Sequence, residues 1–148
     1  MPSPLDAPRF THHIPKKTSV DPKAPKKVLL VEDDLDVRDT LQDLLESEGL
    51  DVIPAANGKQ AIDFLTLNDP PGADLVILDL MMPLVSGWEV LDVLTSDASL
   101  RRIPVIVLSA LPVSRPDRAF EIVRKPFALE TLVSSIRNVL PEADLQPL

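Results

Sequence analysis

The chain has no cysteine and no tyrosine, and its 148 residues include one tryptophan and four phenylalanines. The absence of cysteine excludes disulfides, thiolate metal sites and cysteine nucleophiles. Because 3% of the residues are aromatic while 45% are hydrophobic, we expect a core built from aliphatic side chains. The length suits one domain of ordinary size with some chain to spare.

Long hydrophobic runs are also missing. No apolar run reaches the ~18 residues that a membrane-spanning helix needs. The first ten residues, MPSPLDAPRF, contain no apolar stretch that could serve as the core of a signal peptide. We therefore expect a cytoplasmic protein with no membrane partner.

Charge is distributed unevenly along the chain. Residues 1–27 carry six Lys or Arg and two Asp, a net charge of +4, while residues 28–148 carry nine basic and twenty-one acidic residues, a net charge of −12. An acidic domain repels phosphate backbones, so we expect no nucleic-acid partner for the folded part.

The composition also divides the chain into three parts. Six of the sixteen prolines lie in the first 25 residues, where aliphatic periodicity is almost absent. We interpret residues 1–26 as a disordered tail rich in proline and lysine, because such a segment cannot bury enough apolar surface to fold. Residues 27–140 form the predicted domain, and residues 141–148 a short C-terminal tail.

Within the predicted domain, short apolar runs alternate with helical patterns. Residues 28–31, 52–55, 75–78, 105–108 and 122–123 are the predicted strands, and most of the segments between and after them show the 3–4 spacing of amphipathic helices. Most of these runs are continuously apolar, which is typical of a parallel sheet covered on both faces. The fold class is therefore predicted as α/β, with a doubly wound five-stranded parallel sheet.

Several residues outside the strands have a predicted local role. Asp34 is expected to cap the first helix, because aspartate is favoured at helix starts. Asn57-Gly58 is expected to form a turn, and Gly49 to end the first helix. Glu89 is interpreted as part of a solvated helix face.

Polar side chains follow four of the five predicted strands. Glu32 and Asp33 come after the first strand, Asp79 after the third, Ser109 after the fourth and Lys125 after the fifth. In a doubly wound sheet the carboxyl ends of the strands meet at one edge, so we expect these groups to converge. The alternative is that each acid is an ordinary surface residue at a strand end.

Convergence of three carboxylates would be unfavourable without a cation, because each negative charge disfavours ionisation of the others. A hard divalent ion such as Mg²⁺ resolves this repulsion. Beside such an ion a carboxylate can act as a nucleophile toward a phosphoryl group and form an acyl phosphate. A lysine and a hydroxyl can then stabilise the transferred PO₃ group.

Four segments resemble the receiver domain of two-component response regulators: VLLVEDD, LDLMMP, LSA and RKPF. They occur in the order and with the spacing typical of that family, and the resemblance covers residues 27 to about 140. It implies a flavodoxin-like receiver fold. It also implies a phosphoprotein that receives its phosphoryl group from a sensor histidine kinase or a histidine phosphotransfer protein. The only catalysis expected is Mg²⁺-dependent self-phosphorylation and dephosphorylation.

The resemblance assigns metal and phosphoryl roles to particular residues. Asp79 is similar to the phosphoacceptor of the family. Asp33 corresponds to the direct Mg²⁺ ligand, Glu32 to an acid that acts through water, and the backbone carbonyl of Met81 to a further ligand. Asp79 completes the implied metal set.

The same resemblance implies that Ser109 is the switch hydroxyl and that Lys125 pairs with the phosphoryl group. The bond between Lys125 and Pro126 corresponds to the family's cis peptide, which is physically reasonable because X–Pro bonds adopt cis at modest cost.

The chain departs from the family pattern between Ser109 and Lys125. This stretch includes Pro112 and Pro116 and is too short for a full fourth helix beside the fifth strand. We predict that the helix between the fourth and fifth strands is absent or a single turn. Ile122 stands where the family usually has an aromatic switch residue.

Two apolar residues, Met81 and Leu111, occupy positions that in this family influence how water reaches the acyl phosphate. We therefore predict slow self-hydrolysis of the phosphorylated protein.

The functional prediction is a stand-alone receiver that signals through contacts with a downstream protein or passes the phosphoryl group on. The alternative is a receiver-like interaction module that works without phosphorylation. A nucleotide-binding enzyme is disfavoured, because the first strand is followed by EDDLD rather than a glycine-rich loop and no GxxxxGK[ST] motif occurs.

Overall fold

The computed structural model describes residues 24–68 and 72–141 of the chain. Its elements follow one another in this order: β1 (Lys27–Val31), α1 (Leu35–Ser47), β2 (Asp51–Ala55), α2 (Gly58–Leu67), β3 (Leu75–Asp79), α3 (Gly87–Ser96), β4 (Val105–Ser109), β5 (Glu121–Arg124) and α4 (Leu129–Val139). Each predicted strand is present, with bounds that differ by one or two residues.

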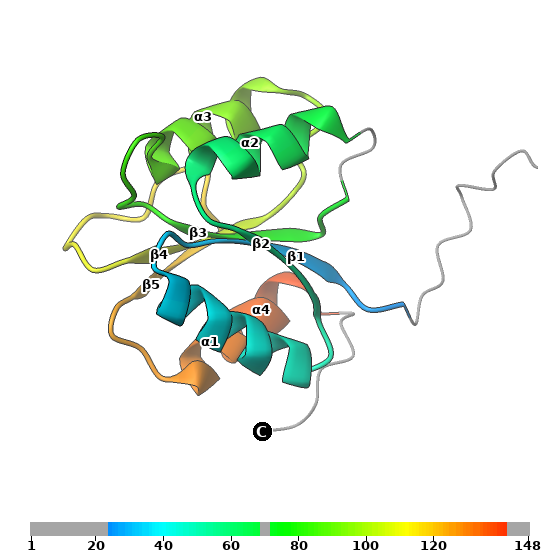
Figure 1. The fold of residues 1–148 in the computed structure, drawn as a ribbon, viewed down its shortest axis with the longest axis vertical. Helices are drawn as coiled ribbons and strands as arrows, with labels where there is room; N and C mark the ends of the chain where they lie inside the picture. Colours follow the sequence, from blue (N-terminus) through cyan, green and yellow to red (C-terminus); the bar gives the residue numbers. More distant parts are fainter. Residues whose placement is uncertain (1–23, 69–71, 142–148) are drawn as a thin grey trace, which may run out of the picture.

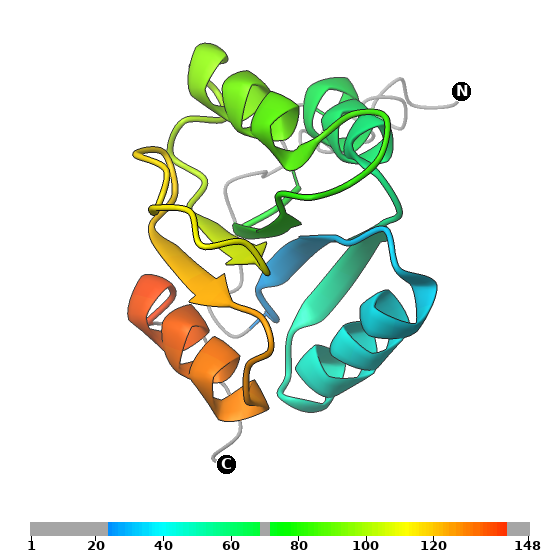
Figure 2. The same cartoon turned by 90° about the vertical axis from the view of Figure 1, so that its left-hand side faces the viewer.

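All five strands are parallel and lie in the order β2-β1-β3-β4-β5. Helices α2 and α3 cover one face of the sheet, and α1 and α4 cover the other (Figures 1 and 2). The predicted doubly wound α/β fold is therefore confirmed. The strand order reverses between β1 and β3, and in open α/β sheets ligands bind at the carboxyl ends of the strands beside such a reversal.

The core is aliphatic and lies in two layers, one on each side of the sheet. Alternate residues of a strand point to opposite faces, so Leu29 and Val31 join the cluster under α2 and α3, whereas Val28 and Leu30 join the one under α1 and α4. Strands β3 and β4 are buried along their whole length. Burial of each such Val, Leu or Ile stabilises the fold by about 1.5–3 kcal/mol, which makes these strands a rigid support for the residues at their ends.

Side-chain caps define the starts of α1, α2 and α3. Asp34 caps α1 by accepting hydrogen bonds from the backbone N–H groups of Asp36 and Val37, so the prediction for Asp34 is confirmed. Asn57 was expected in a turn but caps α2, because its side chain accepts a bond from the Gln60 N–H and Gly58 is already helical.

Two further local expectations differ from the structure. Glu89 is exposed, as expected, but it also takes part in a capping box with Ser86 at the start of α3. Helix α1 ends at Ser47, with Glu48 as its C-cap. Gly49 follows at the left-handed φ of 98°, the conformation that glycine adopts most readily after a helix.

Between β4 and β5 the described chain forms no helix, as predicted; the label α4 belongs to the helix after β5. The loop is drawn yellow in Figure 2. Arginine side chains hold it instead of helical hydrogen bonds. Arg124 donates to the carbonyl groups of Leu111 and Val113, at 3.0 and 2.6 Å. Arg118 donates to carbonyl groups at the end of α3 and in the loop that follows it, those of Leu94, Leu100 and Ile103.

Most of the two predicted tails lies outside the described residues. Of the segment 1–26 the structure describes residues 24–26, and of the segment 141–148 it describes residue 141. Among the described residues, no helix is both long enough and apolar enough to cross a membrane.

Candidate functional site

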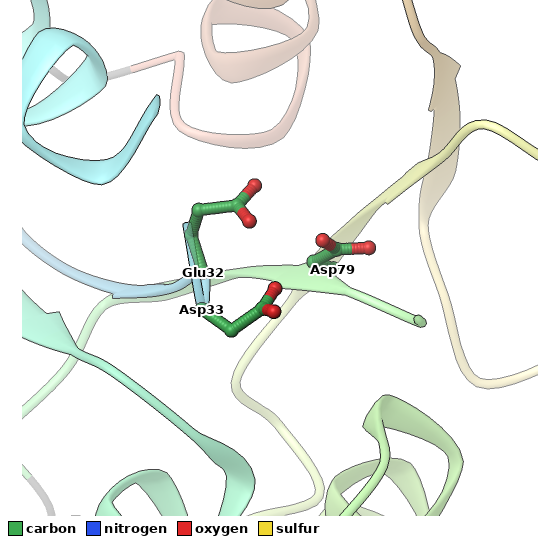
Figure 3. Close-up of side chains that lie close together, drawn as sticks. All are labelled: Glu32, Asp33 and Asp79. Atoms are coloured by element: carbon green, nitrogen blue, oxygen red, sulfur yellow. The ribbon is translucent and has the colours of Figure 1, made fainter. Parts of the chain in front are cut away.

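Three carboxylates meet at the carboxyl ends of β1 and β3. Strand β1 pairs with β3 so that Val31 lies opposite Leu78, which brings Glu32 and Asp33 beside Asp79. One carboxylate oxygen from each of these three acids lies within 4.8 Å of the others (Figure 3). The predicted convergence of the acidic residues is thus present in the structure.

A glycine allows the chain after Asp79 to return close to the end of β3. A Cβ atom on Gly87 would lie 2.4 Å from the carbonyl oxygen of Asp79 and 2.6 Å from the Cα of Leu80. Both atoms belong to the backbone and cannot move aside. Only glycine therefore lets α3 begin in direct contact with the strand end that carries Asp79.

The three acids differ in burial. Glu32 is 1% exposed and Asp79 is 5% exposed, while Asp33 is open to solvent. Glu32 Oε2 accepts a hydrogen bond from the Asp34 N–H at 3.2 Å, and Asp79 Oδ1 accepts one from the Met81 N–H at 3.0 Å. These backbone bonds hold one oxygen of each buried carboxylate in a fixed direction.

The second oxygen of each buried carboxylate faces Lys125. The Nζ atom of Lys125 lies 2.8 Å from Glu32 Oε1 and 3.2 Å from Asp79 Oδ2. Burial by itself lowers the pKa of Lys125, but the hydrogen bond to Glu32 and the charge of Asp79 outweigh it and raise that pKa above its ordinary value. Lys125 is therefore a permanent cation at this site.

Ser109 lies at the end of β4, next to the strand that carries Asp79. Its side chain is buried, and its hydroxyl accepts a bond from the Leu111 N–H at 3.0 Å and donates one to the Leu111 carbonyl at 3.3 Å. Its own carbonyl accepts a bond from the Lys125 N–H at 2.8 Å. Ser109 thus borders the site, with its hydroxyl directed to the following loop.

The peptide bond between Lys125 and Pro126 is cis, as the resemblance implied. Met81 directs its backbone N–H toward Asp79, and its side chain is 52% exposed. Leu111 is also exposed, at 40%.

One residue at the site was missed by the sequence analysis. Arg38 in α1 donates a hydrogen bond from its NH1 group to the backbone carbonyl of Glu32, at 2.9 Å. The sequence held one signal for this contact: Arg38 is a cation one helical turn after the cap residue Asp34 and close to the acidic residues Glu32 and Asp33.

The donor set fits a hard divalent cation. Mg²⁺ prefers oxygen ligands and is commonly bound by one or two carboxylates together with water and phosphate oxygens. The three carboxylates together with Lys125 leave a net charge of −2 at the site. Histidine and cysteine are absent from this cluster, which disfavours zinc.

Comparison with known proteins gives a consistent family match. The model of the response regulator receiver domain matches residues 28–137. The polar-differentiation response regulator DivK of Brucella anthropi is 31% identical over 125 residues, which cover 80% of this chain and 99% of DivK. The probable transcriptional regulator ycf29 of Pyropia yezoensis is 38% identical over 132 residues, which cover 81% of this chain but 58% of ycf29.

Solved structures give the same result. The response regulator TrrA of Thermotoga maritima, in complex with Mg²⁺-BeF, matches with a TM-score of 0.69 and 31% identity, over 78% of this chain and 99% of that one. A complex of the histidine kinase ThkA with TrrA matches with a TM-score of 0.68 and 31% identity, over 78% of this chain and 98% of that one.

Proposed function

Because the chain belongs to the response regulator receiver domain family, we propose that it accepts a phosphoryl group on Asp79 with the help of Mg²⁺. The observation that carries this proposal is the cluster of Glu32, Asp33 and Asp79 within 4.8 Å, with Lys125 bonded to two of them. As a receiver domain the chain is a signalling module rather than a conventional enzyme.

The donor in this proposal is a phosphohistidine on a sensor histidine kinase or a histidine phosphotransfer protein. A carboxylate oxygen of Asp79 attacks the phosphorus atom, a P–O bond forms and the P–N bond breaks. The imidazole leaves and takes up a proton from solvent. The complex of TrrA with the kinase ThkA supports this class of partner.

Glu32, Asp33 and Asp79, with the Met81 carbonyl, are the proposed holders of Mg²⁺, Glu32 through water. The bound ion supplies positive charge for the phosphoryl oxygens and offsets the repulsion among the carboxylates. TrrA in complex with Mg²⁺-BeF supports this choice of ion.

Lys125 and Ser109 have the complementary proposed roles. Lys125 keeps its positive charge because its pKa is raised, so it can pair with the phosphoryl oxygens. Ser109 can donate its hydroxyl to the phosphoryl group once it leaves the Leu111 carbonyl.

Signalling then proceeds through protein contacts in the cytoplasm, with a downstream protein as the receiver of the signal. The net charge of −12 on residues 28–148 supports a protein partner rather than nucleic acid.

Labelling with a small phosphodonor tests this proposal. The purified chain is incubated with ³²P-acetyl phosphate, with and without Mg²⁺, beside Asp79→Asn and Asp74→Asn. Asp74 is a matched control, because it lies just before β3, where its carboxylate accepts a bond from the Lys27 N–H. We expect Mg²⁺-dependent label on the wild type and on Asp74→Asn, and none on Asp79→Asn.

Label that persists in Asp79→Asn would show that another residue is the acceptor. No label on the wild type, from acetyl phosphate or from the host's sensor kinases, would favour the interaction module that works without phosphorylation.

A further inference from the structure

Arg38 connects helix α1 to the strand end that carries the acidic pair. It lies one turn after the cap residue Asp34, to whose carbonyl its backbone N–H donates at 2.8 Å. Its half-buried side chain reaches back over the first turn of α1, and NH1 donates to the Glu32 carbonyl at 2.9 Å. The same residue is thus bonded to both ends of the loop between β1 and α1.

The bond from Arg38 completes the anchoring of Glu32. The Glu32 N–H donates to the Ala55 carbonyl in β2 at 3.1 Å. Its two carboxylate oxygens accept bonds from Lys125 and from the Asp34 N–H. The Glu32 carbonyl lies beyond the last residue of β1. Its hydrogen-bond donor is the side chain of Arg38, outside the sheet.

This carbonyl belongs to the peptide group that joins Glu32 to Asp33. When its direction is fixed, the direction in which Asp33 leaves the backbone is restricted too. Asp33 is solvent-exposed, and packing does little to hold it in place. The Arg38 bond therefore restricts the backbone from which the Asp33 carboxylate extends toward Glu32 and Asp79 (Figure 3).

We propose that Arg38 is a positioning residue for divalent-cation binding, which acts by fixing the peptide group between Glu32 and Asp33. This inference rests on the proposed function, because it concerns the same acidic site. Residues that orient metal ligands without touching the metal typically change metal affinity about 10–100-fold when they are removed.

The charge of Arg38 acts in the opposite direction. A guanidinium near the site repels a dication, so removal of its charge alone would tighten Mg²⁺ binding. Loss of positioning weakens binding. The sign of the change in Mg²⁺ affinity on removal of Arg38 therefore separates the two effects. The charge effect also becomes smaller as the salt concentration rises, while the positioning effect remains.

The test measures Mg²⁺ affinity of unphosphorylated protein by calorimetry and by fluorescence of Trp88, the single tryptophan, which follows Gly87 beside the Asp79 backbone. Arg38→Met removes both the charge and the donor, and Arg38→Lys keeps both. Lys59→Met is the matched control, because it removes a cation from an exposed pair with Asp63 on α2. All are measured at low and high salt.

We expect Arg38→Met to bind Mg²⁺ more weakly than the wild type at both salt concentrations, by about tenfold at high salt and by less at low salt, where loss of the Arg38 charge partly offsets the loss of positioning. Arg38→Lys and Lys59→Met should stay within about twofold of the wild type. Equal or tighter binding by Arg38→Met would overturn the proposal. If that variant does not fold, Arg38→Ala replaces it: it also removes both the charge and the donor, so the same signs apply.

The two proposals fail in distinguishable ways. A wild type that does not bind Mg²⁺ overturns both of them. A wild type that binds Mg²⁺ and is labelled on Asp79, together with an Arg38→Met variant of unchanged affinity, overturns the role of Arg38 alone.

Discussion

Removal of Lys125 should destabilise the folded protein in the absence of Mg²⁺. The Nζ atom lies 2.8 Å from Glu32 and 3.2 Å from Asp79, which are 1% and 7% exposed in their side chains. Lys125→Met leaves these two carboxylates buried beside each other without a cation. Breaking a buried ion pair by removal of one partner costs about 3–5 kcal/mol. Because the Lys125 side chain is 25% exposed, we expect the lower end of that range.

Magnesium should restore much of this loss. A ligand that binds only the folded state stabilises it by about 2.7 kcal/mol at one hundred times its dissociation constant. The variant site carries one more negative charge than the wild-type site, so Mg²⁺ should bind it more tightly and stabilise it more. Urea unfolding of both proteins, with EDTA and with saturating Mg²⁺, measures the two effects.

The control for this experiment is Lys59→Met on α2. The pair of Lys59 with Asp63 is 75% and 49% exposed in its side chains, and such surface pairs contribute about 0–1 kcal/mol. The reasoning is refuted if Lys125→Met unfolds within 1 kcal/mol of the wild type in EDTA, or if Mg²⁺ stabilises it less than it stabilises the wild type.

Three further predictions follow from other features of the structure. The pKa of Lys125 is raised above 10.5 in the folded state. The contribution of Lys125 to stability is therefore full below pH 10.5 and is lost as the pH rises through the folded-state pKa. The difference in urea midpoint between the wild type and Lys125→Met should narrow in that alkaline range. Arg118→Met should lower the free energy of unfolding by about 1–3 kcal/mol, because it leaves the carbonyl groups of Leu100 and Ile103, in the loop after α3, without their charged donor. Arg102→Met, at an exposed position, is the control. The exposed apolar side chains of Met81 and Leu111 predict a phosphorylated lifetime well beyond seconds in a radiolabel decay assay, and complete decay within seconds contradicts this.

The sheet and the acidic cluster could be predicted because both depend on repeating geometry. Continuous apolar runs identify strands of a parallel sheet, and the carboxyl ends of such strands lie at one edge. The position of Asp79 beside Glu32 and Asp33 then follows from the strand order alone. The missing helix before β5 could be predicted for a different reason, because the number of residues and two prolines leave too little chain for it.

Contacts from a side chain to a distant backbone group could not be predicted. Arg38 bonds to the Glu32 carbonyl, Arg118 to carbonyl groups around the end of α3, and Arg124 to the Leu111 and Val113 carbonyls. Such bonds depend on which carbonyl groups the fold leaves without a partner, and no periodic pattern records this. Glu89 illustrates the same difficulty: its exposed position was expected, but its bond to the Ser86 N–H depends on the local turn of the chain.

The charge balance of the site explains why this arrangement serves binding better than stability. Three carboxylates and one ammonium leave a net charge of −2 at a site where two of the acids are almost fully buried. An ion pair in such a place is a weak source of stability, because desolvation offsets much of the attraction. Burial of the aliphatic residues of β1, β3 and β4 offsets the desolvation cost of these charges. The same residues hold the strand ends in place whether or not the charges are balanced. The net charge of −2 at the site is equal in size and opposite in sign to the charge of a divalent cation. This uncompensated negative charge favours binding of the ion.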